Sequence, residues 1–308
     1  MLYFLFLVTL FFSIALCHDH PMVGVISYPG SPSAKDSTSY IQVETAKFIE
    51  STGARNVGIR FDQDWPTSVK ILQSLNGIYI QNSFNGEKSQ NPIFKETLKN
   101  AYEYSSDKNA QGITFPIWTS GITALQLSEV LSSTQDMAKF TEKIDALDYA
   151  TTLNIIEFLT PNEKVQITNM RTNFLKPATM ENIVYFNQDR GMTVESFKND
   201  KFLSSNFDVV ATATDRQGKE FIAILKGKEV PVVLSFALFE AVYNFYPKTA
   251  VPHSSEATRL AVQFSKSFTN MCRANDQTYG SVEKEYENNL YNRKLTTTID
   301  PEYQTFYF

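Results

Sequence analysis

Short apolar runs alternate with amphipathic segments through the first half of the chain. The apolar runs, short enough for buried strands, are Met22–Tyr28, Asn56–Phe61, Gly77–Ile80 and Thr114–Trp118. Segments with helical spacing or with proline in the first turn lie at Tyr40–Ser51, Thr67–Leu75, Pro92–Ser106 and Ile122–Leu131. This alternation predicts an α/β fold with a doubly wound, mostly parallel sheet and helices on both faces.

The second half has a different pattern. Three closely spaced apolar runs, with turn residues between them, lie at Phe207–Thr214, Glu220–Lys226 and Val230–Leu238. Such spacing is typical of hairpins, so the sheet is expected to be mixed. A long amphipathic helix is predicted over Glu256–Asn275. We find no internal repeat or linker, and residues 18–308 are therefore expected to form one domain.

The first 17 residues form a separate segment. Met1–Cys17 is almost wholly apolar, is short for a bilayer span, and ends in small residues at Ala15 and Cys17. We interpret residues 1–17 as a secretory signal peptide, with an uncleaved membrane anchor as the alternative. No later stretch is apolar over a sufficient length, so we expect no membrane attachment after signal cleavage.

Composition limits the chemistry. With 43% hydrophobic and 20% charged residues, the chain can bury a full core, and a net charge of −5 argues against nucleic-acid binding. Loss of Cys17 leaves only Cys272, which excludes an internal disulfide and a cysteine-rich metal site and is interpreted as a small helix residue. His18, Asp19 and His20 could bind a metal, but they lie at the presumed new N-terminus without a further ligand, and we expect neither a metal nor a cofactor.

The segment Gly112–Ser128 is typical of a buried strand, a sharp turn and a helix. Hydrolytic α/β proteins often carry a nucleophile on such an elbow, and the residue at this tip is Gly121. The hydroxyls of Thr119, Ser120 and Thr123 flank the tip, and we interpret them as turn and capping groups. The elbow therefore lacks its reactive atom.

Several stretches resemble one known family over nearly the whole chain after residue 17. They are PMVGVISYPG, YIQVETAKFIESTGARNVGIRFD, LNGIYIQ, FPIWTSGITALQLS, FDVVATATDRQGKEFIAILKGKEVPVV and VPHSSEATRLAVQFSKSFTN. The chain resembles the gamma-glutamyl hydrolase, or folylpolyglutamate hydrolase, family, which has a glutamine-amidotransferase-like fold. This resemblance implies a cysteine-type omega peptidase that removes γ-linked glutamate by covalent catalysis. It also implies an extracellular, lysosomal or vacuolar location.

The residue-by-residue comparison implies that the catalytic set is incomplete. The nucleophilic Cys of the family falls on Gly121 and its catalytic His on Leu238, while the orienting acid is retained as Glu240. A Pro-Gly-Gly loop that shapes the oxyanion hole falls on Gln81–Ser83, and a substrate-contacting His falls on Gln188. The residues expected to contact a substrate are Ser83, Ile122, Arg171 and Gln188.

Three hypotheses follow for a member with no intact catalytic set. The first is that the chain is a pseudoenzyme that binds a partner, as a homodimer or as a heterodimer with an active relative. The second is that it binds γ-glutamyl or folate ligands without cleaving them. The third is that it hydrolyses them through a relocated catalytic group such as Ser120. The first predicts a cleft filled by Leu238 and Phe239, and the second predicts an open cleft lined by Arg171 and Gln188. The third requires a nucleophile hydrogen-bonded to a base.

Three further residue types have structural interpretations. Trp118 and the aromatic run that includes Phe236 and Phe239 are expected in the core. His253 is expected at the surface or at a helix cap. Glu240, without a histidine partner, is expected either to begin the following helix or to line a pocket.

Overall fold

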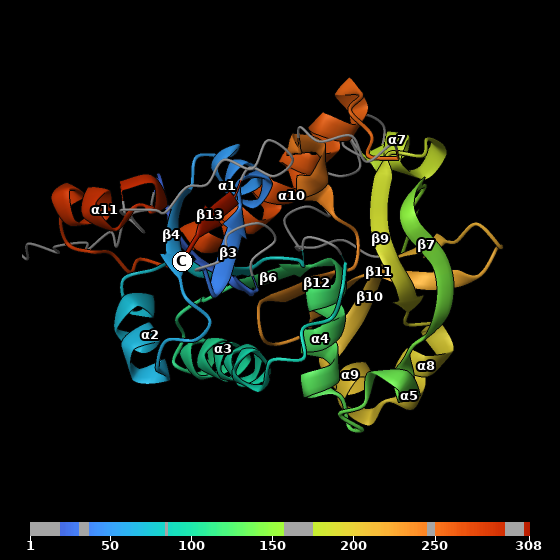
Figure 1. The fold of residues 1–308 in the computed structure, drawn as a ribbon, viewed down its shortest axis with the longest axis horizontal. Coiled ribbons are helices and arrows are strands. Elements are labelled where there is room, and N and C mark those ends of the chain that lie inside the picture. Colours follow the sequence, from blue (N-terminus) through green and yellow to red (C-terminus); the bar gives the residue numbers. More distant parts are fainter. Residues whose placement is uncertain (1–18, 31–36, 84–85, 157–174, 245–249, 293–304) are drawn as a thin grey trace, which may run out of the picture.

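A central sheet of eight strands organises the molecule (Figure 1). The computed structural model describes residues 19–30, 37–83, 86–156, 175–244, 250–292 and 305–308. In sheet order the strands are β4 (Arg55–Ile59), β1 (Met22–Ile26), β5 (Gly77–Ile80), β6 (Ile117–Ser120), β12 (Val232–Ser235), β11 (Glu220–Gly227), β10 (Phe207–Thr214) and β8 (Asn154–Ile155). Neighbouring strands from β4 to β12 pair in parallel, and those from β12 to β8 pair antiparallel. The predicted mixed, mostly parallel sheet is confirmed.

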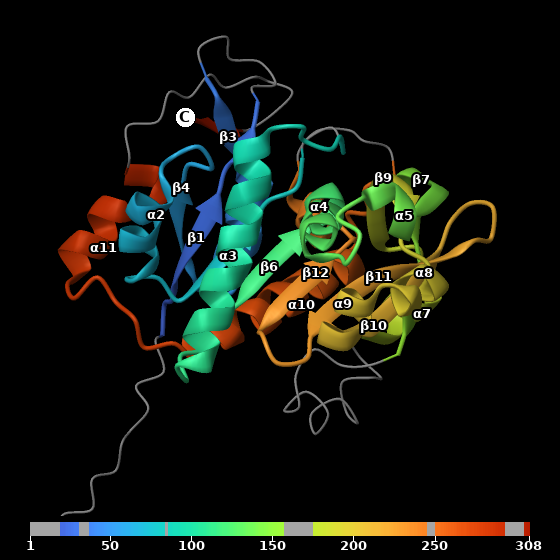
Figure 2. The same cartoon turned by 90° about the horizontal axis from the view of Figure 1, so that it is seen from below.

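Helices cover both faces of this sheet (Figures 1 and 2). One face carries α1 (Val43–Glu50) and α10 (Ser255–Arg273). The other face carries α2 (Trp65–Leu72), α3 (Pro92–Ala110), α4 (Gly121–Leu131) and α9 (Lys201–Asn206). Two separate apolar clusters fill these layers, because alternate residues of each buried strand point to opposite faces. Trp118 and Phe236 lie one in each cluster, as core residues.

Smaller elements surround the sheet. They are β2 (Tyr28–Pro29), β3 (Ser39–Gln42), α5 (Met137–Phe140), β7 (Glu142–Thr151), α7 (Leu175–Met180), β9 (Val184–Gly191), α8 (Val194–Asn199), η1 (Phe239–Tyr243), α11 (Val282–Asn288), η2 (Leu290–Asn292) and β13 (Thr305–Tyr307). Strands β7 and β9 form a separate antiparallel ribbon beside α4. Among the described residues, no helix combines the length and the apolar character needed to cross a bilayer.

One predicted helix was partly wrong. The helix expected over Tyr40–Ser51 begins only at Val43, because Ser39–Gln42 is a strand that pairs with β13 and β2. Its partner β13 lies more than 260 residues further along the sequence. The spacing of apolar residues around Ser39–Gln42 therefore gives no sign of this pairing. The predicted strands Thr114–Trp118 and Val230–Leu238 are shifted, to Ile117–Ser120 and Val232–Ser235.

Candidate functional site: a filled elbow

The elbow lies at the carboxyl end of β6, an inner strand of the parallel part of the sheet. Gly121 has φ +56°, a left-handed conformation that side chains disfavour, and α4 begins at this residue. Strands β5 and β12 flank β6 in parallel, so the residues that follow them meet at the same edge. Those residues are Asn82 and Leu238. A Cβ atom added to Gly121 would lie 2.6 Å from Asn82 Cγ and 2.8 Å from Leu238 Cδ2. The position expected for a nucleophile has neither a side chain nor space for one.

Asn82 makes a direct contact with the start of α4. Its Oδ1 accepts the backbone N–H of Ile122 at 2.8 Å, and its Nδ2 donates to the carbonyl of Ser83 at 2.6 Å. The first N–H groups of a helix have no partner within the helix, so Asn82 satisfies one of them. In a nucleophile elbow, the N–H after the nucleophile is one of the donors of the oxyanion hole. Here that donor is already occupied.

Ser120 points into a buried network. Tyr79 donates its hydroxyl hydrogen to Ser120 Oγ at 3.1 Å, and Ser120 donates to Glu240 Oε1 at 2.5 Å. Burial raises the pKa of Glu240 to about 7, against the lowering effect of the Ser120 hydrogen bond. Burial, and then the charge of Glu240, raise the pKa of Tyr79. Glu240 thus lies in the first turn of η1 and also faces a cavity.

The interpretation of Thr119, Ser120 and Thr123 as turn and capping residues holds only for the position of Ser120. Ser120 occupies the N-cap position of α4 without a side-chain capping bond, because its hydroxyl bonds Glu240. Thr119 lies within β6 and Thr123 within α4, and both hydroxyl oxygens are buried without a hydrogen-bond partner among the described residues.

The cavity above the elbow is small. Its volume is about 30 Å³, which is enough for about one water molecule. It is lined by Gln42, Glu44, Asn82, Tyr185, Asn187, Leu238, Glu240, Ala241, Asn244 and Val251. Two of these side chains are acids and none is basic. Leu238 is 6% exposed and packs with Tyr185, Ala241 and Val251.

The predicted substrate residues have different surroundings in the structure. Ser83 and Ile122 lie at the elbow. Gln188 is buried but does not line the cavity, and its amide atoms have no hydrogen-bond partner among the described residues. Its neighbours in β9, Tyr185 and Asn187, line the cavity instead. The alternation of strand side chains would have indicated this pair if β9 had been recognised. Arg171 lies outside the described residues.

Four other residues considered from the sequence, Phe239, Cys272, His253 and His20, do not line the cavity. Phe239 stacks on Phe264 at a centroid distance of 3.8 Å, so it packs into the core rather than into the cavity. Cys272 is fully buried, and burial raises the pKa of its thiol. His253 is exposed, with Nδ1 3.1 Å from the carbonyl oxygen of Val242. His20 Nε2 lies 3.4 Å from Glu285 Oε2. Within the described ranges, no cluster of His, Cys, Asp and Glu is able to hold a metal.

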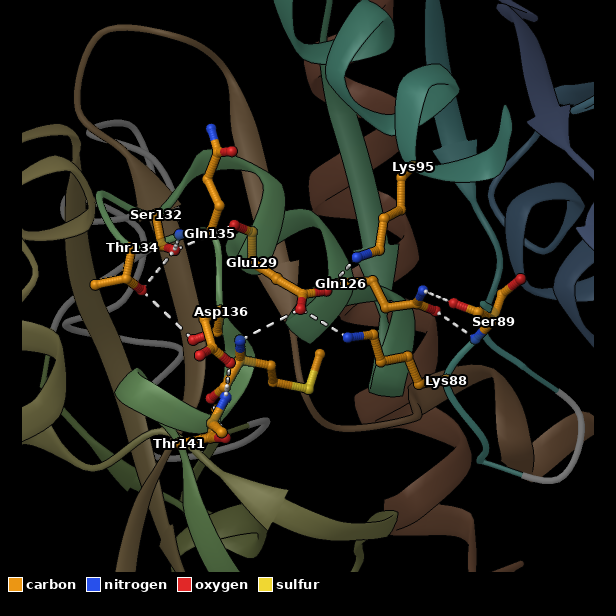
Figure 3. A network of polar contacts seen from close by, with 12 residues as sticks. Lys88, Ser89, Lys95, Gln126, Glu129, Ser132, Thr134, Gln135, Asp136 and Thr141 are labelled. Atoms are coloured by element: carbon orange, nitrogen blue, oxygen red, sulfur yellow. Dashed lines mark hydrogen bonds and ion pairs between the residues drawn. The ribbon is translucent and has the colours of Figure 1, made fainter. Parts of the chain in front are cut away.

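Lys88, Ser89 and Lys95 contact polar side chains of α4 (Figure 3). Lys88 Nζ lies 2.6 Å from Glu129 Oε1, and Lys95 Nζ lies 3.5 Å from Glu129 Oε2. One turn earlier on α4, Gln126 Nε2 donates to the Ser89 carbonyl at 3.0 Å, and its Oε1 accepts the Ser89 N–H at 3.2 Å.

Removing the charge of Glu129 is expected to destabilise the folded protein. Glu129→Gln leaves two lysines without their buried counter-charge, and we expect the free energy of unfolding to fall by about 2 kcal/mol. The matched control is Glu103→Gln in the exposed Lys99–Glu103 pair, where a change under about 0.5 kcal/mol is expected. Chemical denaturation of both variants measures the difference. Equal losses would show that the Glu129 cluster does not stabilise the fold.

A mixed, mostly parallel sheet, with helices on both faces and a strand–turn–helix near its centre, defines the class of the protein as α/β. The solved structure of a putative GMP synthase component from Thermoplasma acidophilum has a TM-score of 0.45 at 13% identity, covering 83% of this chain and 94% of that one. PurLQS from Thermotoga maritima has a TM-score of 0.42 at 13% identity, covering 82% of this chain and 97% of that one. No known family model matches the chain.

Curated proteins are similar over most of the chain. Gamma-glutamyl hydrolase B of Dictyostelium discoideum is 26% identical, over 96% of this chain and 84% of its own length. Gamma-glutamyl hydrolase 1 of Arabidopsis thaliana is 23% identical, over 90% and 78%. Gamma-glutamyl hydrolase of Homo sapiens is 26% identical, over 82% and 77%. The chain is a homologue of the eukaryotic gamma-glutamyl hydrolases.

Proposed function

We propose that this protein is a pseudoenzyme: a gamma-glutamyl hydrolase homologue that does not cleave γ-glutamyl bonds and acts through binding or assembly. One observation carries the proposal. The elbow residue is Gly121, and the space in front of it is taken by Asn82 and Leu238. No covalent intermediate forms on a residue without a side chain, and Leu238 neither accepts nor donates a proton. Loss of a nucleophile or base in such a set costs on the order of 10⁶ in turnover.

The cavity also disfavours a γ-glutamyl ligand. A poly-γ-glutamyl chain carries several carboxylates, and cationic side chains favour its recognition. None of the residues that line the cavity is cationic, and two of them, Glu44 and Glu240, are acids in a volume of about 30 Å³. Ligand sites for small molecules are commonly ten or more times larger. This favours a partner-binding role over a non-cleaving γ-glutamyl binder.

A second candidate function follows from the Ser120–Glu240 contact. A serine hydroxyl that donates to a carboxylate resembles an activated nucleophile and its base. However, Ser120 is 0% exposed, bonds Tyr79 on the core side and does not line the cavity. A substrate carbonyl therefore has no route to its oxygen. We treat hydrolysis through Ser120 as the alternative hypothesis.

Incubation with a γ-glutamyl oligomer distinguishes the two functions. We expect no release of glutamate, measured by mass spectrometry, from either the wild-type protein or Ser120→Ala. Release by the wild-type protein that disappears in Ser120→Ala would establish the alternative function. Release by both proteins would overturn the pseudoenzyme proposal and leave the catalytic group unknown.

The proposal places the protein in the secretory pathway, extracellular or in a lysosome or vacuole. Its support is the apolar segment 1–17, which lies outside the described residues. Mass spectrometry of the exported protein should give an N-terminus near residue 18. We also propose assembly, either with a second copy or with an active relative. Light scattering of the protein alone and mixed with such a relative tests it, and a monomer in both samples would reject it.

A further inference from the structure

A second cavity lies at the β8 edge of the central sheet. Its volume is about 480 Å³, which is within the range of small-molecule binding sites, whereas the cavity above the elbow has about 30 Å³. In the sheet, β12 and β11 separate β6 from β10, and the two cavities share no lining residue. We call the second cavity the edge groove; it lies between residues 152–155, α7 and the end of β10.

The floor of the edge groove is aliphatic. It consists of Leu153, Ile155, Leu175 and Ala213. Leu153 and Ala213 are each 2% exposed and belong to the apolar cluster on the α10 face of the sheet. The Leu153 N–H donates to the Ala178 carbonyl at 2.7 Å, which holds the chain before β8 against α7. An aliphatic group of a ligand would therefore be removed from water on a preformed apolar surface.

The rim of the edge groove is polar and carries one charge. Lys176, Asn154 and Thr214 line the groove from α7, β8 and β10, and all three residues are exposed. Lys176 has no ion-pair partner among the described residues, and none of the described residues that line the groove is acidic. A carboxylate is the complementary group for the Lys176 ammonium. The Asn154 carboxamide and the Thr214 hydroxyl offer both donors and acceptors to an amide.

We propose that the edge groove binds an N-acylated aliphatic amino acid. The carboxylate of the ligand lies beside Lys176, its aliphatic side chain lies on the floor, and its amide is hydrogen-bonded at the rim. A free acylated amino acid and the C-terminal residue of a peptide share this chemistry. The inference goes beyond the proposed function, because the groove shares no residue with the elbow cavity.

Titration of the full protein with N-acetyl-leucine at neutral pH, followed by nuclear magnetic resonance, tests the inference. We expect saturable shifts of the backbone amides of Leu153, Ile155 and Ala213, with a dissociation constant on the order of 1 mM for so small a ligand. N-acetyl-leucinamide has the same shape without the charge and should bind roughly fivefold more weakly, since an exposed charge pair contributes modestly. Absence of saturable shifts at these residues, or equal binding of the acid and the amide, would overturn the inference.

Three variants locate the ligand. Lys176→Gln should weaken N-acetyl-leucine binding roughly fivefold and leave N-acetyl-leucinamide binding unchanged. Lys198→Gln, which makes the same charge change at an exposed position of α8 outside the groove, should leave both unchanged. Thr214→Phe places a bulky ring at the rim and should weaken the binding of both probes. Equal losses in Lys176→Gln and Lys198→Gln, or full binding in Thr214→Phe, would overturn the assignment to the edge groove.

The source of the ligand is distinguished by a longer probe. An alanine peptide that ends in leucine with a free carboxyl group carries the same terminal chemistry as N-acetyl-leucine. Tighter binding of the peptide than of N-acetyl-leucine would support the inference with a chain terminus as the ligand. Equal binding would support it with a free acylated amino acid. Binding of the peptide that Lys176→Gln does not weaken would overturn the inference.

Discussion

Gly121→Ala should lower the free energy of unfolding by about 3 kcal/mol. Part of the loss, about 1–2 kcal/mol, arises because a side chain disfavours the positive φ of +56°. The rest arises because the new Cβ would lie 2.6 Å from Asn82 Cγ and 2.8 Å from Leu238 Cδ2, and overpacking of this kind costs about 1–3 kcal/mol. Chemical denaturation measures the total.

Two other glycines separate these effects. Gly112 and Gly218 have φ values of +79° and +84°, and a Cβ at either would meet nothing within 4 Å. Alanine at these positions should therefore cost only the conformational part. If Gly121→Ala lowers the free energy of unfolding by no more than these control substitutions, Asn82 and Leu238 do not fill the space beside Gly121. In the Asn82→Ala background, the cost of Gly121→Ala should decrease, and the double-mutant cycle gives the coupling between the two residues.

Glu240→Gln should make the free energy of unfolding less dependent on pH. The pKa of Glu240 is about 7 in the folded protein, raised by burial from an ordinary value of 4.5. A raised acid pKa means that the folded state holds the proton longer than the unfolded state. Stability therefore falls as pH rises from about 4.5 to about 7, by about 3 kcal/mol at 1.36 kcal/mol per pKa unit. A neutral carboxamide at this position would remove the loss, so we expect Glu240→Gln to be the more stable protein at pH 8.

Other carboxyl groups do not obscure this test. Burial also raises the pKa of Glu50, which adds to the slope in both proteins, so the difference between them belongs to Glu240. The pKa of Asp62 is lowered by its hydrogen bond with Arg60, and its effect falls below this pH window. The exposed Glu103→Gln variant is the control and should keep the wild-type slope. Parallel stability curves for wild type and Glu240→Gln would contradict the assigned burial effect.

The main layers of the fold were predictable because they depend on local patterns. Strand Gly77–Ile80 and strand Phe207–Thr214 have the predicted limits, since continuous apolar runs are bounded there by turn residues. The β7–β9 ribbon was missed because β7 is mostly exposed or half-buried and gives no clear apolar run. Strand β3 was missed because its partner β13 is distant in sequence.

The candidate site was predictable in position but not in detail. The resemblance placed Gly121, Leu238 and the Gln81–Ser83 loop together, and the parallel strand order places them at one sheet edge. That Asn82 bonds the start of α4, and that Ser120 bonds Glu240, depends on side-chain directions across the sheet. Sequence spacing contains no such information. The same limit applies to Gln188, whose neighbours Tyr185 and Asn187 line the cavity.

The most direct test of the central claim compares kcat/KM for glutamate release from a γ-glutamyl oligomer with that of an active gamma-glutamyl hydrolase. Both proteins should be assayed from acidic to neutral pH, after folding has been verified by thermal unfolding. We predict a value for this protein lower by a factor on the order of 10⁵ or more, since Gly121 and Leu238 stand where the family resemblance places the nucleophile and the base. A value within about a hundredfold of the active enzyme, a loss of about 2.7 kcal/mol in transition-state stabilisation, would contradict the account.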